Sequence, residues 1–268
     1  MLALLIYAGP AAARGGNCET LPLAADALSA AMDASQALFD TLQSLDAELA
    51  IIGRVGSDLS NRGLKYSHAA FVWRDHPKGR WSVVHLLNLC GDDTGGLFEQ
   101  GLLNFFLDDP FRLDIKLLVP TPELQKGIVR EIGSARALRL FQPQYSILAS
   151  PWASRYQNSN QWLMEVTALA QAGAVHAVPP TRMAAQDWLR QKNFQGTTIF
   201  VSPLEQMFGG LFQANLRFDD HPQRARMRGA YEVVTVRAVE DYLARTGGLS
   251  LSRELISPVL PPPALARH

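Results

Sequence analysis

The chain is short of cysteine, of net charge and of long hydrophobic runs. It contains 2 cysteines in 268 residues, and its 25 basic and 25 acidic side chains give a formal net charge of +0. This balance provides no basic field for nucleic acid and no acidic arm for a disordered interaction. No apolar run approaches the length of about 18 residues that a membrane-spanning helix needs, so we predict none.

The common metal and nucleotide motifs are also missing. The sequence has no His-Glu-x-x-His or Cys-x-x-Cys pattern, and no glycine-rich loop follows a predicted strand. We therefore predict no metal site and no cofactor. Asp92-Asp93 and Asp108-Asp109 are loop acids, which form turns and caps more often than calcium sites. Arg224, Arg226 and Arg228 are interpreted as a solvated face, with contact to a phosphate or cell-wall anion as the alternative.

The first residues resemble an export signal. Residues 1–8 are a short apolar core, Gly9-Pro10 ends it, and Ala11-Ala12-Ala13 supplies small residues before a cleavage point. A basic segment before the core is missing, and a buried N-terminal strand is the alternative interpretation. We expect residues 1–13 to be a signal peptide and the mature protein to be periplasmic or secreted.

Export gives the two cysteines, Cys18 and Cys90, a specific meaning. In an oxidising compartment an even pair favours a disulfide, here one that ties the mature N-terminus to the body of the protein. Such a bridge closes a long loop and contributes about 3–5 kcal/mol in the chain-entropy picture. A catalytic cysteine is the weaker alternative, because Cys90 lies between a predicted strand and a loop rather than at a helix N-terminus.

The spacing of apolar residues predicts a mixed series of helices and strands. We expect helices over residues 21–53, 97–107, 121–133, 158–173, 181–191 and 238–245, and strands over residues 67–73, 81–89, 113–119, 197–201, 214–218 and 231–236. These elements do not alternate regularly and no linker divides the chain, which favours an α+β fold. We predict a single domain over residues 14–250 and a flexible, proline-rich tail over residues 251–268.

Two segments carry the candidate chemical groups. His68 and His85 lie on two predicted strands joined by a hairpin loop, which can bring their side chains within reach of each other. Ser159 follows Asn158 at the start of a predicted helix, where free backbone N–H groups can hold an oxyanion. Each group also has a structural interpretation. A strand histidine is often half-buried and bonded to backbone, and Asn158 with Gln161 resembles a capping box.

The order of these segments resembles the circularly permuted branch of the NlpC-type papain-like superfamily, the branch that includes lecithin:retinol acyltransferase-like proteins. Gly56-Ser57-Asp58-Leu59 leads into Tyr66-Ser67-His68, His85 follows on the next strand, and Asn158-Ser159 begins a helix. In those proteins the two strands carry a base histidine and a second polar residue, and a nucleophilic cysteine begins the helix. The whole chain also resembles a family of uncharacterised exported bacterial proteins that share its Gly-Ser-Asp-Leu-Ser, Ser-His-Ala and Tyr-Gln-Asn-Ser-Asn-Gln-Trp segments.

The papain-like resemblance covers about residues 55–170. It implies a permuted papain-like core, with an antiparallel sheet packed on helices, and leaves a C-terminal α/β extension over about residues 175–250. It also implies a hydrolase or acyltransferase that acts on an amide or ester in the cell envelope. Because serine stands where those enzymes have cysteine, the alternative is a non-catalytic module that binds an envelope peptide, glycopeptide or lipid.

The resemblance assigns roles to six residues. Ser159 is the expected nucleophile, His68 the base and His85 its orienting partner. The oxyanion or substrate-binding groups are expected to be Tyr156, Asn158 and Ser67, together with the Ser159 backbone N–H.

Overall fold

The computed structural model describes residues 24–90, 92–108, 110–212 and 215–257. The predicted signal peptide and Cys18 lie outside these residues, so export and the Cys18–Cys90 disulfide stay predictions. In the part of the chain that is described, no helix has the length and apolar character needed to cross a membrane.

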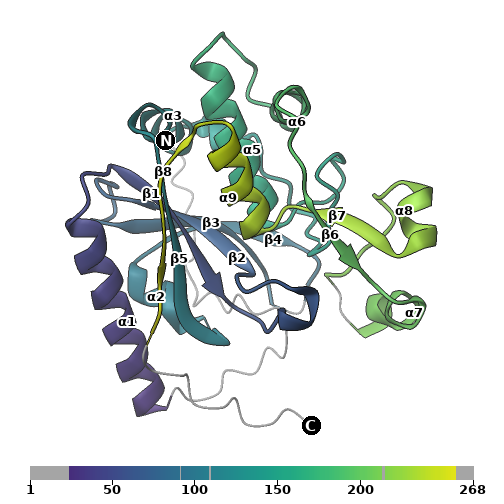
Figure 1. Cartoon of the computed structure of the whole chain (residues 1–268), viewed down its shortest axis with the longest axis horizontal. Coiled ribbons are helices and arrows are strands. Elements are labelled where there is room, and N and C mark those ends of the chain that lie inside the picture. The colour runs from purple at the N-terminus through teal and green to yellow at the C-terminus, as the bar shows by residue number, and fades with distance from the viewer. Residues whose placement is uncertain (1–23, 91, 109, 213–214, 258–268) are drawn as a thin grey trace, which may run out of the picture.

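A six-stranded antiparallel sheet forms the centre of the fold (Figure 1). Its strand order is β4-β3-β2-β1-β5-β8, and all five neighbouring pairs are antiparallel. The strands are β1 (Leu49–Val55), β2 (His68–Trp73), β3 (Ser82–Asn88), β4 (Gly95–Gln100), β5 (Arg112–Pro120) and β8 (Leu249–Leu255). The predicted mixed fold with an antiparallel sheet is therefore confirmed.

Helices cover both faces of this sheet. One face packs against α3 (Pro122–Ile132), α5 (Ser159–Gly173), α6 (Arg182–Gln191) and α9 (Val236–Arg245), and the other against α1 (Ala25–Gln43) and α2 (Leu102–Leu107). Successive side chains on a strand point to opposite faces. Accordingly, β1 contributes Leu49 and Ile51 to the core under α5, and Ala50 and Ile52 to the core under α1 and α2.

Helix α5 lies at the centre of its layer, and its residues from Ser159 to Ala170 are all buried. Helix α3 packs closely against it at Gly127, where a Cβ would come within 3.2 Å of the Ala170 Cβ. A glycine in the middle of a helix costs stability, and here it permits this close approach. The short helix α4 (Ala135–Leu138) and an irregular segment lead from α3 to the start of α5.

A small lobe projects from the main body of the protein. It consists of the two-stranded ribbon β6 (Thr197–Phe200) and β7 (Ala230–Val233) with the helices α7 (Pro203–Phe212) and α8 (Gln223–Arg228). Figure 1 shows it to one side of the central sheet, and we refer to residues 197–233 as the ribbon lobe. The chain turns back into β7 at Gly229, whose φ of +60° and close approach to the Val201 carbonyl require glycine.

Two predicted helices were wrong in part. The predicted helix over residues 21–53 ends at Gln43, and residues 49–55 form the central strand β1. All seven residues of β1 are buried because both of its faces are covered, so its sequence shows no strand alternation. The predicted helix over residues 97–107 is split, because residues 95–100 form β4 and only residues 102–107 are helical.

One predicted strand and the predicted tail also need correction. The predicted strand over residues 214–218 is wrong, because residues 215–218 form no strand. Residues 251–255 were assigned to a flexible tail, but they belong to β8 and pair with β5 at the edge of the sheet. The leucines of β8 alternate with polar residues, which is the pattern of a strand with one covered face.

Candidate functional site

The two strand histidines form a hydrogen-bonded pair. His68 Nε2 lies 2.9 Å from His85 Nδ1, and the ring centroids are 5.1 Å apart. The strands β2 and β3 are paired with Phe71 opposite Val84. Continuing that register sets His85 diagonally across from His68, within reach of a side-chain contact. The hairpin thus brings together the two histidines named from the sequence.

The histidine pair lies in a buried environment beside a cation. Both rings pack against Phe105 of α2, with centroids 6.0 and 5.9 Å from it. Arg54 of β1 donates from Nη1 to the Phe105 carbonyl oxygen at 2.7 Å and forms an ion pair with Asp108. Burial, and after it the charge of Arg54, lowers the pKa of both His68 and His85 well below the usual value of 6.5. Both imidazoles are therefore neutral at neutral pH.

One nitrogen of the pair has no hydrogen-bond partner in the described part of the chain. His85 Nε2 is buried and makes no hydrogen bond to any described residue. A buried polar atom without a partner costs about 1–3 kcal/mol. No hydrogen bond to a described residue offsets this cost. The packing of the two neutral rings therefore does not by itself explain why the pair is buried.

Ser159 begins α5 and contacts Tyr145, a residue outside the predicted site. Its hydroxyl oxygen lies 3.2 Å from the hydroxyl of Tyr145. Burial raises the pKa of Tyr145, while hydrogen bonds from the Ser159 hydroxyl and backbone N–H act in the opposite direction. The neutral phenol thus stands directly before the first turn of α5. Asn158 caps this helix, which is the structural alternative to the oxyanion or substrate-binding role expected for it, because its Oδ1 accepts from Gln161 N at 2.8 Å.

Asn160 joins the start of α5 to the strand that carries His68. Its Oδ1 accepts from Ala69 N at 2.8 Å, and its Nδ2 donates to the carbonyl oxygens of Ser67 and Val234 at 3.2 and 3.3 Å. Ser67 and Ala69 flank His68 on either side. The side chain of Asn160 therefore fixes the first turn of α5 against the first residues of β2.

Ser159 and the histidine pair nevertheless form two separate contacts. In the described part of the chain no hydrogen bond joins Ser159 to His68 or His85, since Ser159 bonds to Tyr145 and the histidines bond to each other. Strand alternation puts His68 in phase with Ala70, which belongs to the core under α1 and α2, whereas α5 packs on the other face. The structure does not form a Ser159–His68 nucleophile–base contact.

The remaining predicted site residues have other partners. Tyr156 donates its hydroxyl to Asp219 Oδ2 at 3.4 Å, and burial raises its pKa. The Ser67 hydroxyl accepts from Gly56 N at 2.9 Å, which ties the Gly-Ser-Asp-Leu segment to β2. Tyr156 therefore points to the ribbon lobe, and Ser67 holds a loop in place.

A buried ion pair fixes the segment that carries Tyr145. Glu165 on α5 bonds to Arg182 on α6, with Arg182 Nε 2.9 Å from Glu165 Oε2. Gln157 donates to the same carboxylate oxygen at 2.6 Å and pairs in a β-bridge with Tyr145. Burial raises the pKa of Glu165, and Arg182 opposes that shift. This network positions the Tyr145 phenol before α5.

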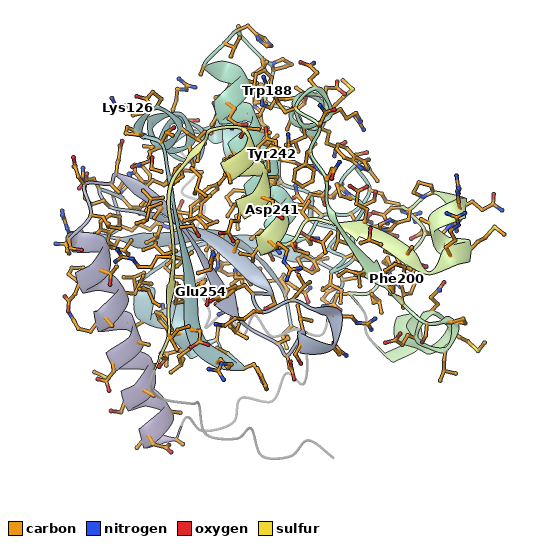
Figure 2. The ribbon with its side chains drawn as sticks, in the orientation of Figure 1. Lys126, Trp188, Phe200, Asp241, Tyr242 and Glu254 are labelled. Atoms are coloured by element: carbon orange, nitrogen blue, oxygen red, sulfur yellow. The ribbon has the colours of Figure 1, made fainter. Side chains whose placement is uncertain are left out.

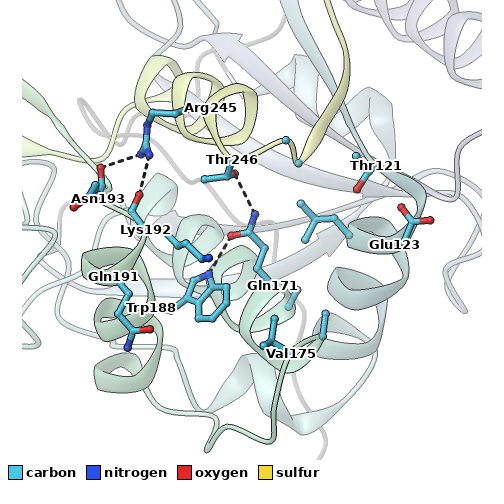
Figure 3. A pocket seen from close by; sticks show the side chains of 15 residues that line it. Thr121, Glu123, Gln171, Val175, Trp188, Gln191, Lys192, Asn193, Arg245 and Thr246 are labelled. Carbon is cyan, nitrogen blue, oxygen red and sulfur yellow. Dashed lines mark hydrogen bonds between the residues drawn. The ribbon is translucent and has the colours of Figure 1, made fainter.

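A cavity of about 510 Å³ lies at the opposite end of α5 (Figure 3). Gln171 forms its centre: Oε1 accepts from Trp188 Nε1 at 3.2 Å and from the Tyr242 hydroxyl at 2.5 Å, and Nε2 faces Thr246 Oγ1 at 3.4 Å. Gln171 is about 18 Å along the helix axis from Ser159 at 1.5 Å per residue. The cavity is therefore distinct from the cluster at the N-terminus of α5.

The rim of the cavity carries charges of both signs. Glu123 lies in the first turn of α3, and Lys192 follows α6 with its ammonium 4.7 Å from the centre of the Trp188 ring. No group of three His, Cys, Asp or Glu residues able to hold a metal ion occurs among the residues that the structure describes.

These features define a protein of mixed helix and sheet with a buried histidine pair and a tyrosine-covered serine at a helix N-terminus. Residues 41–243 match a family described as an uncharacterised protein conserved in bacteria (DUF2145), and the chain belongs to that family. No curated protein and no solved structure matches the chain. The predicted likeness to an uncharacterised bacterial family is confirmed, while the papain-like relationship stays a proposal.

Proposed function

We propose that this protein is a non-catalytic binding or accessory module of the bacterial cell envelope, built on a permuted papain-like core. The contact between the Tyr145 and Ser159 hydroxyls carries the proposal. A serine nucleophile needs an adjacent general base and open donors for an oxyanion. Here the tyrosine takes the place of the base and stands in front of the helix N–H groups.

Burial supports the same conclusion. Ser159 is 6% exposed and Tyr145 is 8% exposed, so a substrate carbonyl has little access to the serine hydroxyl. The pKa of Tyr145 is raised by burial, which keeps the phenol neutral and makes it a poor base at neutral pH. The histidine pair remains on this scaffold as a buried polar contact.

The cavity around Gln171 is the proposed ligand site. Its lining combines apolar groups such as Leu124 and Val175 with the Gln171 amide and the charges of Glu123 and Lys192. Concave sites with a mainly apolar lining and a few placed polar groups suit small ligands. Separate charges of opposite sign and amide groups favour a peptide or glycopeptide of the envelope over a lipid.

A titration with a soluble disaccharide–tetrapeptide fragment of peptidoglycan tests this assignment. We expect saturable binding by calorimetry, and Lys192→Ala is expected to weaken it at least fivefold because a rim charge is lost. Lys126→Ala is the matched control, since Lys126 is exposed on α3 and does not line the cavity (Figure 2). Absence of saturable binding, or equal weakening in both variants, would contradict the site.

A hydrolase or acyltransferase is the second candidate, and the 2.9 Å contact between His68 and His85 favours it. Such a pair is the base and orienting group that the papain-like resemblance implies. Catalysis would require the Tyr145 side chain to leave Ser159 and His68 to reach the face of the sheet on which α5 packs.

A fluorophosphonate probe separates the two candidates. Under the binding proposal the wild-type protein stays unlabelled, and Ser159→Ala is indistinguishable from it. Labelling of the wild type that is lost in Ser159→Ala and increased in Tyr145→Phe would replace the binding proposal with the catalytic one.

A further inference from the structure

The end of the ribbon lobe carries exposed apolar side chains. Phe200, Leu204, Met207 and Met227 are 67, 66, 66 and 80% exposed. They belong to β6, α7 and α8. Phe200 pairs with Ala230 at the end of the ribbon where β6 leads into α7 and α8 leads into β7. Figure 2 shows Phe200 on this lobe, away from the central sheet. Single exposed apolar residues are common, but four in one small lobe are not explained by the packing of the residues that the structure describes.

The same end of the lobe carries unpaired positive charge. Arg224, Arg226 and Arg228 are all exposed on α8 and surround Met227 in sequence. None of them forms an ion pair with a described residue, as the ion pairs of the lobe involve other side chains.

The acidic residues of the lobe are engaged elsewhere. Glu205 pairs with Arg62, and Asp219 pairs with Arg155. Asp220 is turned inward, with its Oδ2 accepting from Ser150 N at 2.9 Å. Glu232, the fourth acidic residue of the lobe, accepts from Trp152 Nε1 at 2.9 Å and from Gly196 N at 2.8 Å. The exposed charges of α8 are therefore its three arginines, in a protein whose formal net charge is +0.

We propose that the ribbon lobe docks onto the surface of a membrane that contains anionic lipids. Surface binding of this kind combines apolar side chains at the level of the acyl chains with Lys or Arg beside the headgroups. The methionines suit this environment because their unbranched, flexible side chains adapt to an irregular apolar phase. Negative headgroups complement the three arginines, and the lobe lies apart from the cavity around Gln171, so both can be occupied at once.

Vesicle sedimentation of the full chain tests the docking. Vesicles of phosphatidylglycerol and phosphatidylethanolamine should bind the protein, and vesicles of phosphatidylcholine alone should not. Each arginine near an anionic surface contributes a factor of about five to the partition coefficient. We therefore expect the triple variant Arg224→Gln, Arg226→Gln, Arg228→Gln to bind at least tenfold more weakly, and binding to fall as salt is raised.

A charge-matched control distinguishes binding by the ribbon lobe from an effect of the protein's net charge. Lys126→Gln, Arg139→Gln, Arg253→Gln removes the same charge from exposed residues that lie outside the lobe and form no ion pair with a described residue, and it should bind as the wild type does. A second variant, Leu204→Ser, Met207→Ser, Met227→Ser, keeps the charge and should also lose binding. All these positions are exposed, so each variant is expected to keep the wild-type circular dichroism spectrum.

Three outcomes would overturn the docking proposal. The first is no binding to anionic vesicles, in which case the lobe meets a different partner such as a protein. The second is equal binding to both kinds of vesicle. The third is the same loss in the control variant as in the arginine variant, which would assign the attraction to total charge rather than to the ribbon lobe.

Discussion

At the scale of single residues, the histidine pair makes stability depend on pH. The pKa of both His68 and His85 lies well below 6.5 in the folded protein, mainly because both are buried. The unfolded chain therefore binds two protons below about pH 6.5 that the folded protein does not bind, so stability falls as pH drops through that value. Each group contributes about 1.4 kcal/mol for the first unit below it.

We therefore expect the free energy of unfolding in urea to be about 2–3 kcal/mol lower at pH 5.5 than at pH 7.5. In the double variant His68→Gln, His85→Gln, most of this difference should disappear. His176→Gln is the control, because His176 is exposed, and it should keep the difference. If the double variant retains the full pH dependence, another group carries the protons.

The buried ion pair allows a second prediction at this scale. Arg182→Ala leaves the Glu165 carboxylate buried without its cation, and breaking such a pair costs about 3–5 kcal/mol. Arg155→Ala is the matched comparison, since the Arg155–Asp219 pair is exposed and such pairs contribute about 0–1 kcal/mol. Urea unfolding of both variants measures the difference. Equal losses would mean that the Glu165 carboxylate finds other compensation.

The residues of the candidate site were predictable only where local sequence determines them. The capping interpretation of Asn158, given as the alternative to a binding role, could be made because capping is decided within one turn, and His85 could be placed near His68 because a hairpin connects their strands. Tyr145 was missed because its contact with Ser159 depends on a loop held by distant groups. Asn160 was missed because two of its bonding partners lie about ninety residues earlier in the chain and the third, Val234, lies 74 residues later.

At the scale of elements, Asn160 decides how α5 meets the sheet. Its side chain makes three hydrogen bonds to the backbone of two other segments, and two of these partners flank His68. Asn160→Ala leaves the Ala69 N–H without an acceptor, and a buried unpaired donor costs about 1–3 kcal/mol. We expect the variant to be less stable by that amount and the Ala69 amide to exchange its hydrogen faster.

Asn158→Ala is the comparison for this prediction. It removes only the cap, at a cost of about 1 kcal/mol, and should leave the exchange of the Ala69 amide close to that of the wild type. If both variants speed that exchange equally, the effect comes from fraying of α5 rather than from the lost bond to β2.

Strand β1 was the element hardest to predict from the sequence. Leu49 and Ile52 continue the three- and four-residue spacing of α1, so the apolar pattern runs on past the end of the helix. The strand has neighbours on both edges and cores on both faces, and such strands lose the alternation that identifies them. Pairing with β2 and β5 decides the structure of β1, and the periodicity of its sequence does not reveal that pairing.

At the scale of the whole molecule, β8 returns the end of the chain to the sheet. It pairs with β5 from Leu255 opposite Ile115 to Leu249 opposite Pro120, and Leu251 and Leu255 pack against the core under α1 and α2. Beyond the strand, Ser257 N donates to Asp114 Oδ1 at 3.0 Å. The described end of the chain is thus part of the fold, although it follows the last helix of the layer around α5.

Two truncations distinguish the contribution of β8 to stability from that of the proline-rich residues that follow it. Removing residues 249–268 deletes β8 and exposes the edge of β5, and the loss of three partly buried leucines costs about 3 kcal/mol at roughly 1 kcal/mol each. A loss of that size lowers the melting temperature by roughly 6–12 °C, and an exposed strand edge favours association. Removing only residues 258–268 leaves β8 and its described contacts in place, so this truncation is the control for the loss of the strand, measured by melting temperature and by elution volume on size exclusion. If the two truncations melt at the same temperature, β8 adds no stability and the sheet is complete with five strands.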